Sequence, residues 1–336
     1  MTCFLSVVAA ARNDDYGGDF LSRLQVFVNL LAYQFTTFGI DGELLLVDWN
    51  PPKDKPLLKD ALTWPRNLKA RVFVVGNEIH DKFPNPRNVT MFQFIASNAA
   101  IRRSSGRYIL ATNADVIFNT ELAEFLASQK LDSDCFYRAD RYDVFDKIPF
   151  TSSPLEILSF CSTHFSKADL RGGSIDVPCQ QSTKLGQLRW EIRRSAHEIQ
   201  SRYRRVGFYR EGVHLLRRLD DVLYGNASGC FTLMSRENWF YLKGSSEDPL
   251  IFLADSYLIS AAFAMGLHQV QLPSSLRMYH LDHQRVWTQW PYAHRAYLEW
   301  LRDTRQMLSS KKPIIYNDDN WGLAGYKLDE YSFGAS

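Results

Sequence analysis

The first third of the chain alternates short apolar segments with helical patterns, and this alternation limits the possible folds more than any other feature. An amphipathic helix is predicted at about Phe20–Phe35, and a second helix at Met91–Arg103. Strands that alternate with helices build a parallel sheet, so we expect an α/β fold with a mostly parallel sheet and flanking helices. The first predicted strand, Phe4–Ala11, is a continuous apolar run, as in a strand covered on both faces. The other predicted strands are Glu43–Asp48, Arg71–Val75 and Arg107–Thr112.

Polar residues gather where three of these strands end. In an open parallel sheet, ligands bind outside the carboxyl ends of the strands, so side chains there are expected to share a site. A carboxylate in such a place can hold Mg²⁺ or Mn²⁺ against a diphosphate, because a hard cation takes many of its oxygen ligands from phosphate and water. The residues are Arg12, Asn13 and Asp14 after the first strand, Asp48 at the end of the second, and Asn113 and Asp115 after the fourth.

Composition and missing motifs exclude several classes of protein. The 336 residues are 46% hydrophobic and 23% charged, which excludes a disordered, collagen-like or coiled-coil chain. A formal net charge of +2 argues against a dedicated nucleic-acid binder, whose affinity depends on many neutralised phosphates. The sequence contains no phosphate-loop motif, no GxGxxG, no GxSxG and no HExxH. Nucleotide triphosphatases, dinucleotide-binding enzymes, serine hydrolases and zinc peptidases of the usual kinds therefore lose their main support.

Several features predict a cytoplasmic protein. The five cysteines are scattered and lack zinc-site spacing, so we expect free thiols in a reducing compartment. The N-terminal segment has no basic region ahead of its apolar residues, and it is more typical of a first strand than of a secretory signal. The most apolar later stretch, Leu250–Leu267, has Asp255 in its middle and falls short of a membrane span.

The second half of the chain is less regular. Residues 146–182 hold Pro, Ser, Gly and Cys with little periodicity, and they predict a long, partly ordered connection. A helix is predicted at Lys184–Val206, in a basic insertion, 184–218, that contains ten basic and three acidic residues. This helix could be a solvated lid, a seat for an acidic acceptor or an interfacial helix on anionic lipid. Further predicted elements are the strand Gly229–Ser235 and helices near Pro249–Met265 and Tyr292–Leu308.

Three sequence blocks together resemble the nucleotide-sugar glycosyltransferases of the GT-A fold, near the inverting family-2 enzymes. The blocks are ARNDDYGGDFLSRLQ (Ala11–Gln25), LLVDWN (Leu45–Asn50) and NAAIRRSSGRYILATNADVIF (Asn98–Phe118). The resemblance covers about residues 3–145 and continues in patches through Gly229–Trp239, Ala254–Gly266 and Tyr279–Trp287. It implies a Rossmann-like GT-A domain in which residues 1–145 bind the nucleotide sugar and residues 146–336 bind the acceptor.

The resemblance also implies a divalent cation, Mn²⁺ or Mg²⁺. Asp115 stands at the last position of the family's DxD-like motif, which is the usual metal ligand, whereas Asn113 replaces the acid at the first position. His280 and His283 are candidates for further metal ligands, although two histidines three residues apart on a strand or turn would not both face one ion. The implied nucleotide-sugar-binding residues are Arg12, Asn13, Asp14, Asp48, Asn98, Arg102, Asn113 and Asp115. Turn formation and helix capping stay open as alternatives for the acids among them.

Inverting transfer also needs a carboxylate that takes the proton of the acceptor hydroxyl. The resemblance implies that this acid lies at the start of a buried helix, which is the position of Asp255. A lone Asp in an apolar stretch is costly to bury unless it is paired or belongs to a site. A helix cap is the alternative role for Asp255, and Glu247 and Asp248 are the other candidates for the base.

The expected protein is therefore a cytoplasmic transferase, peripheral at a membrane if residues 184–206 bind lipid. It would move a sugar from a nucleotide-diphospho-sugar to a carbohydrate or lipid-linked acceptor, with no nucleic-acid partner. A sugar-phosphate nucleotidyltransferase shares the sheet type, but the chain lacks the Gly-rich loop that usually follows the first strand in that class. A catalytically degenerate protein that binds sugar nucleotides or glycans is a second alternative, because Asn113 replaces an acid.

Overall fold

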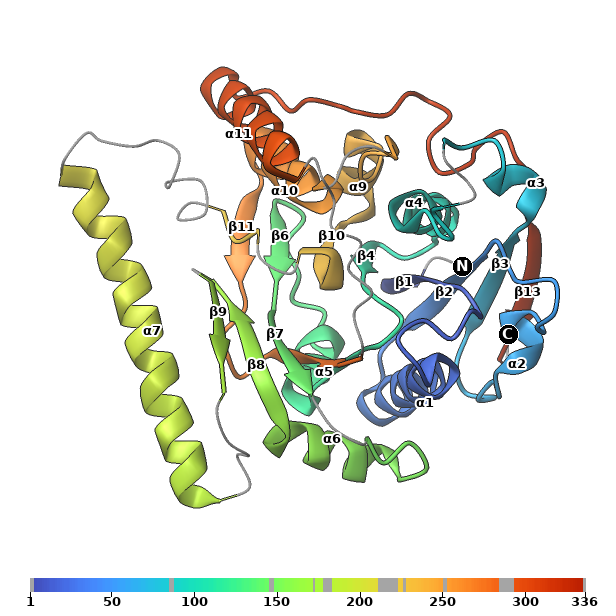
Figure 1. The fold of residues 1–336 in the computed structure, drawn as a ribbon, viewed down its shortest axis with the longest axis horizontal. Helices are drawn as coiled ribbons and strands as arrows, with labels where there is room; N and C mark the ends of the chain where they lie inside the picture. Colours follow the sequence, from blue (N-terminus) through green and yellow to red (C-terminus); the bar gives the residue numbers. More distant parts are fainter. Residues whose placement is uncertain are drawn as a thin grey trace.

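An eight-stranded sheet with the order β11-β6-β10-β4-β1-β2-β3-β13 forms the centre of the molecule (Figure 1). The computed structural model describes residues 3–84, 88–144, 148–171, 173–177, 183–210, 223–225, 228–249, 253–283 and 293–334. β1 pairs in parallel with β2 and β4, and β2 with β3, so the predicted parallel sheet is confirmed. The strands are β1 (Leu5–Ala11), β2 (Gly42–Trp49), β3 (Ala70–Val75), β4 (Tyr108–Ala111), β6 (Cys135–Arg138), β10 (Thr232–Ser235), β11 (His268–Gln271) and β13 (Asp329–Phe333).

Different helices cover the two faces of this sheet, because its central strands are buried on both sides. Val7 and Ala9 of β1 belong to a core shared with α1 and α5, whereas Val8 and Ala10 belong to a core shared with α4, α9 and α10 (Figure 1). This alternation explains why β1 and β2 are buried at every position. The helices are α1 (Phe20–Phe38), α2 (Leu58–Ala61), α3 (Asn77–His80), α4 (Gln93–Arg103), α5 (Thr120–Ala127), α9 (Arg236–Leu242), α10 (Ala254–Ala264) and α11 (Ala293–Ser310), with a 3₁₀ turn η1 (Ser228–Cys230).

A second sheet of five strands, in the order β5-β12-β7-β8-β9, continues from the first. β7 begins two residues after β6 ends, and β5 follows β4 after a short turn that contains Asp115. In the parallel pair of β12 with β7, His280 lies opposite Asp143. In the antiparallel pair of β12 with β5, His280 lies opposite Val116. The strands are β5 (Val116–Phe118), β7 (Asp140–Val144), β8 (Phe165–Leu170), β9 (Gly173–Asp176) and β12 (Arg277–Leu281).

The prediction of a partly ordered connection over residues 146–182 is wrong, because the described part of this stretch forms α6 (Pro154–Thr163), β8 and β9. Ser153 begins α6 through a capping box with Glu156, and Pro154 follows in the first turn, so the sequence does contain a helix start signal. β8 is harder to recognise, since its Lys167 and Asp169 are engaged in an ion pair within the sheet and interrupt the apolar pattern.

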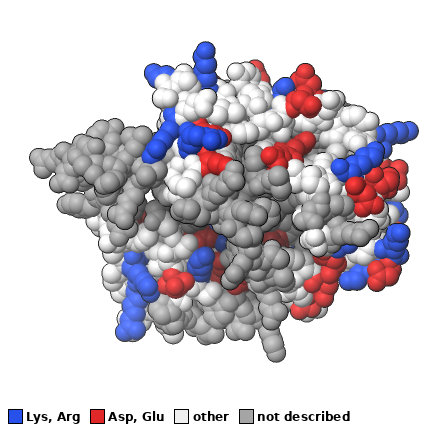
Figure 2. Space-filling model, turned by 45° about the horizontal axis from the view of Figure 1, so that its top comes forward, with Lys and Arg blue, Asp and Glu red and all other residues white. Residues whose placement is uncertain are grey.

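The basic helix α7 (Lys184–Arg210) lies at one edge of the molecule, next to the second sheet (Figure 1). The predicted helix Lys184–Val206 is thus confirmed, while residues 211–218 of the predicted insertion lie outside the described residues. None of the described helices combines the length and the apolar composition needed to cross a membrane. Over the described part of the face in Figure 2, basic and acidic side chains are interspersed, in keeping with the near-neutral net charge.

Candidate functional site

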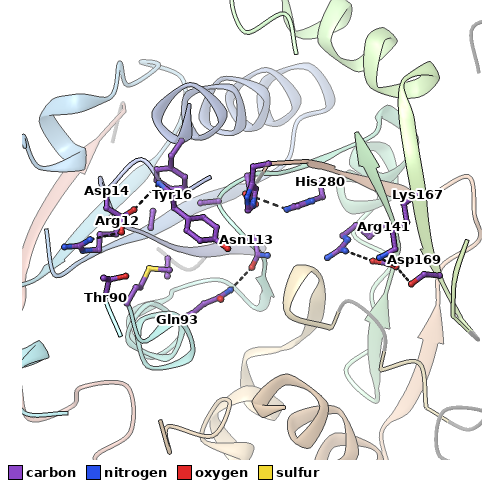
Figure 3. A pocket seen from close by; sticks show the side chains of 18 residues that line it. Arg12, Asp14, Tyr16, Thr90, Gln93, Asn113, Arg141, Lys167, Asp169 and His280 are labelled. Atoms are coloured by element: carbon purple, nitrogen blue, oxygen red, sulfur yellow. Dashed lines mark hydrogen bonds and ion pairs between the residues drawn. The ribbon is translucent and has the colours of Figure 1, made fainter. Parts of the chain in front are cut away.

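A cavity of about 640 Å³ lies at the carboxyl ends of β1 and β4 (Figure 3). One end is formed by residues that follow β1, and the other by residues of the second sheet. Between them lie the turn after β4, the start of α4 and the end of β12, so the cavity joins segments that are far apart in the chain. The side chains that line the cavity include Arg12, Asp14, Tyr16, Asn113, Asp115, Arg141, Lys167, Asp169, His280 and His283.

Asp115, His280 and His283 converge in the middle of this cavity. Oδ2 of Asp115 lies 3.4 Å from Nε2 of His283 and 3.7 Å from Nε2 of His280. The ligand atoms of the three side chains all lie within 4.8 Å of one another. The expectation that the two histidines would not both face one ion is wrong, because β12 ends at Leu281 and the chain that follows directs His283 back toward the same carboxylate.

These three side chains fit a divalent cation. They offer one carboxylate oxygen and two imidazole nitrogens, a donor set that suits Mn²⁺ and other transition ions better than Mg²⁺. Nδ1 of His280 lies 3.2 Å from Oδ1 of the buried Asp143. A carboxylate beside Nδ1 favours the tautomer with its proton there, which leaves Nε2 with a lone pair on the side of Asp115.

The charges around Asp115 hold its carboxyl group ionised. Burial alone would raise the pKa of Asp115, but His280, His283 and Arg23 outweigh burial and lower that pKa below its usual value. Nε of Arg23 lies 3.8 Å from Oδ2 of Asp115, and the Arg23 side chain also donates to the backbone carbonyls of Tyr16 and Gly18. An anionic Asp115 is the form that a cation requires.

Sequence reasoning missed Arg23, although a signal for it exists. Arg23 is only 2% exposed and lies on the buried face of α1, three residues after Phe20 and four before Phe27. A cation at that position in an apolar helix face needs a partner, because burying an unpaired charge is costly. Its proximity to Asp115 and its two backbone bonds supply the partners and tie the loop after β1 to the site.

An ionic network lies at the second-sheet end of the cavity and joins the buried Asp143 and Asp169 to the partly exposed Arg141 and Lys167. Arg141 pairs with Asp143 at 2.9 Å and with Asp169 at 2.5 Å, and Lys167 pairs with Asp169 at 3.2 Å. Arg141 also donates to Sγ of Cys230 at 3.2 Å. No motif marks these residues, since they are brought together only by the pairing of β7 with β8. Through Asp143, the network supports His280.

The residues after β1 occupy the other end of the cavity. Arg12 and Asp14 form an ion pair at 2.7 Å, and Nε of Arg12 donates to the carbonyl of Asn50 at 2.7 Å. The neighbouring Asn13 is buried and donates instead to the carbonyl of Pro56, so it does not line the cavity. Of the three residues predicted in this segment, Arg12 and Asp14 therefore line the cavity, and their mutual ion pair holds them in position.

Asn113 occupies the wall between the two ends of the cavity. Its carbonyl accepts a hydrogen bond from Gln93 at 2.7 Å, and its amide donates to Sγ of Cys230 at 3.3 Å. Gln93, the first residue of α4, also lines the cavity and was not predicted. These contacts fix the amide beside Asp115, at the position where the resemblance implies an acid.

Asp48, Asn98 and Arg102 do not line the cavity. Oδ2 of Asp48 accepts a hydrogen bond from the backbone of Leu58 at 2.8 Å, and burial raises the pKa of Asp48 to about 6. Asn98 is fully buried and donates to the carbonyl of Ser245 and to Glu247. Arg102 donates to the carbonyl of Trp321 and lies over its ring. These predicted nucleotide contacts therefore have other partners in the structure.

Asp255 lies in the first turn of α10, as predicted, but not in the wall of the cavity. Its Oδ2 accepts a hydrogen bond from the backbone of Gly229 at 2.8 Å. The next residue, Cys230, contacts both Asn113 and Arg141 of the cavity wall. Asp255 is thus separated from the cavity by the turn at residues 229–230. Of the other candidates for the base, Glu247 accepts hydrogen bonds from Asn98 and from the backbone of Gly322.

Comparison with solved structures identifies the fold. The chain is similar to S. aureus TarS 1–349 in complex with UDP-GlcNAc, with a TM-score of 0.51 and 13% identity over 92% of this chain and 69% of that one. Similarity is weaker to a longer S. aureus TarS chain (TM-score 0.39, 12% identity, 83% of this chain and 37% of that one). It is also weaker to glucosyl-3-phosphoglycerate synthase from Mycobacterium tuberculosis in complex with phosphoglyceric acid (TM-score 0.40, 12% identity, 95% and 82%). No family model and no curated protein matches the sequence. The chain has the GT-A fold that its sequence blocks predict.

Proposed function

We propose that this protein is a glycosyltransferase that takes its sugar from a nucleotide-diphospho-sugar and uses a divalent cation. The observation that carries the proposal is the convergence of Asp115, His280 and His283 in a cavity at the carboxyl ends of parallel strands. Arg12 and Asp14, which follow β1, line the same cavity as these three side chains. A protein of the same fold, TarS, is known with UDP-GlcNAc bound, which supports a nucleotide-sugar donor here.

Asp115, His280 and His283 would hold the cation, and we propose Mn²⁺ in preference to Mg²⁺ because two of the three ligands are imidazoles. A bound divalent cation neutralises negative charge on a diphosphate leaving group. Asn113 provides no charge at the first position of the acidic motif, and the two histidines supply the additional protein ligands instead. Asp143, 3.2 Å from Nδ1 of His280, and Arg23, 3.8 Å from Oδ2 of Asp115, would help to hold these ligands in place.

The end of the cavity that is formed by the residues after β1 would hold the nucleoside. Arg12 is fixed by Asp14 and by the carbonyl of Asn50, so its guanidinium needs little reorganisation when a ligand arrives. The ring of Tyr16 is 46% exposed and packs edge to face on His283, so its free face is available to a base. This arrangement would place the diphosphate beside Asp115 and the sugar toward the second sheet.

We propose Asp255 as the base that takes the acceptor's proton in an inverting displacement. The turn at residues 229–230 separates Asp255 from the cavity wall. Asp255 is the second residue of α10, the helix to which the resemblance assigns the base. Asp169 does line the cavity, but its oxygens are engaged by Arg141, Lys167 and Ser174. The acceptor, a carbohydrate or a lipid-linked sugar, would enter at the end that Asp169 and Lys167 form.

A cytoplasmic setting is part of the proposal. The four cysteines in the described part of the chain, Cys3, Cys135, Cys161 and Cys230, are all free thiols, which supports a reducing compartment.

A hydrolysis assay over UDP- and GDP-sugars, with Mn²⁺, Mg²⁺ or a chelator, tests the proposed reaction. Slow release of a nucleoside diphosphate that depends on Mn²⁺ is the expected result, because many transferases pass the sugar to water when no acceptor is present. Release of pyrophosphate from a sugar phosphate and a nucleoside triphosphate would instead identify a nucleotidyltransferase. Donor-dependent thermal stabilisation without any turnover would identify a binding protein.

A further inference from the structure

Helix α7 has one face on the protein and one directed away from it. Trp190 is 5% exposed, and its ring packs edge to face against Tyr142 and Phe165 of the second sheet. Arg194 and His197, which follow Trp190 at helical spacing, are half-buried on the same side. The side of α7 that carries Trp190 is therefore covered by the second sheet, and the opposite side faces away from the protein.

The opposite side of α7 carries a stripe of exposed apolar side chains. Leu185, Leu188, Ile192 and Ile199 are each between 57% and 62% exposed. Their spacing of three, four and seven residues places them on one helix face. Among the described residues, four of the nine exposed large apolar side chains lie on this one stripe. Such a concentration marks an interaction surface, since exposed apolar side chains are normally scattered.

The charged side chains of α7 lie on the two flanks of this stripe, acids on one and arginines on the other. Glu191 and Glu198 are the only acids of the helix, and both form ion pairs with the half-buried Arg194, at 2.8 Å and 2.5 Å. Arg189 and Arg193 are exposed and lie along one flank of the stripe, about 40° and 80° from Leu185 around the helix axis. No ion pair joins either of them to another residue that the structure describes. One flank of the stripe is thus cationic, while the two acids on the other flank are neutralised by Arg194.

We propose that α7 binds the surface of an anionic membrane through this stripe, with Arg189 and Arg193 on lipid phosphates. An interfacial helix buries its apolar face at the boundary of the acyl chains while its basic residues contact the headgroups. Guanidinium groups match phosphate oxygens in charge and geometry. A second copy of the chain fits less well, because two such faces would bring four like-charged arginines together. No residue of α7 lines the cavity, so membrane binding by this helix does not depend on the proposed reaction.

Sedimentation of the full chain with lipid vesicles tests this proposal. Binding to vesicles that contain phosphatidylglycerol is expected, with much weaker binding to phosphatidylcholine alone and release at high salt. Leu188→Ser combined with Ile192→Ser should weaken binding about tenfold or more, because two apolar side chains no longer leave water. Arg189→Gln combined with Arg193→Gln should weaken it about thirtyfold on anionic vesicles only.

A matched control is Tyr241→Ser on α9, since Tyr241 is 58% exposed but lies outside the stripe. This variant should bind vesicles like the parent, and all variants should keep the parent's melting temperature. Equal vesicle binding by the stripe variant and the parent would overturn the proposal. Analytical ultracentrifugation provides a second refutation: a parent dimer that the stripe substitutions dissociate would assign the surface to a second copy.

Discussion

Asp115 is surrounded by His280, His283 and Arg23, and these neighbours determine what its replacement would do. Because it is the single anion of the three-residue cluster, Asp115→Ala should weaken Mn²⁺ binding by at least about 100-fold. Asn113→Ala should have a smaller effect, since a neutral amide contributes less to holding a dication. Isothermal titration with Mn²⁺ in the absence of donor measures both variants. An Asp115→Ala protein that binds Mn²⁺ like the parent would show that the cation lies elsewhere.

Asp143 acts on the same cluster indirectly, through Nδ1 of His280. Asp143→Asn should lower Mn²⁺ affinity by about 10–100-fold, the usual effect of losing a carboxylate that orients a histidine ligand. Asp169→Asn is the matched control, because Asp169 also pairs with Arg141 but does not contact His280. Electron paramagnetic resonance of free Mn²⁺ follows both titrations. Equal losses in the two variants would assign the effect to the Arg141 network as a whole.

Asp48 is fully buried, and burial raises its pKa from 3.8 to about 6. A carboxyl whose pKa is raised in the folded state contributes stability below its unfolded pKa, and that contribution is lost as the pH rises through 6. Asp48→Asn, which stays neutral, should therefore gain stability over the parent above pH 6, by up to about 3 kcal/mol. Urea unfolding of both proteins below pH 4 and above pH 6 measures this difference.

A difference in stability that does not change with pH would show that Asp48 is not a desolvated acid. The same pair of proteins also tests the nucleotide contact expected from the sequence. If Asp48→Asn weakens donor binding while the fold is intact, the side chain contacts the nucleotide in the complex. Unchanged donor affinity would leave Asp48 with its observed role, which is to accept the backbone hydrogen bond of Leu58.

At the scale of secondary-structure elements, α10 positions Asp255 behind the turn at residues 229–230. Asp255→Asn keeps an oxygen that can accept the hydrogen bond from Gly229 but cannot take a proton. The expected result is a loss of turnover of about 10²–10⁴-fold, with unchanged donor affinity because Asp255 does not line the cavity. Activity assays, calorimetry of donor binding and NMR of the product anomer give separate readouts.

The outcomes for Asp255→Asn are distinct. Full activity would remove Asp255 from the chemistry, and a product with the donor's anomeric configuration would remove the inverting mechanism. Loss of the folded state, measured by circular dichroism, would make Asp255 a structural acid of α10. Lost turnover in a folded protein that binds the donor is the result that agrees with a base.

At the scale of the whole molecule, two adjacent arginines of α4, Arg102 and Arg103, hydrogen-bond to residues 321–326 of the C-terminal segment. Arg103 donates to the carbonyls of Gly322, Leu323 and Tyr326, whereas Arg102 donates to that of Trp321 alone. Arg103→Met should therefore lower the free energy of unfolding by about 3 kcal/mol, and Arg102→Met by less, because more buried carbonyls lose their donors. Urea unfolding compares them, and equal losses would contradict the hydrogen-bond explanation.

The sequence was sufficient for the parallel half of the fold, since β1 to β4 are mostly apolar and polar residues stand at the carboxyl ends of three of them. It also indicated Asp115, His280 and His283, but not their convergence, which depends on the pairing of β12 with β5 and β7. The sequence did not predict the second sheet, because its strands are short and the charged residues that pair with Arg141 interrupt their apolar pattern. Asn98 and Arg102 illustrate the opposite error, because buried polar residues that match a motif can serve packing instead.

The cation cluster takes Asp115 from the first 145 residues and both histidines from the rest of the chain. Neither half alone contains the three side chains, so the proposed metal site depends on the association of the two halves. If the chain were expressed as two fragments divided between Val144 and Ile148, neither fragment would be expected to bind Mn²⁺ tightly. Recovery of Mn²⁺ binding when the fragments are mixed would then show that they associate as in the intact chain. The measurement reads this association at the buried Asp115, and it needs no substrate.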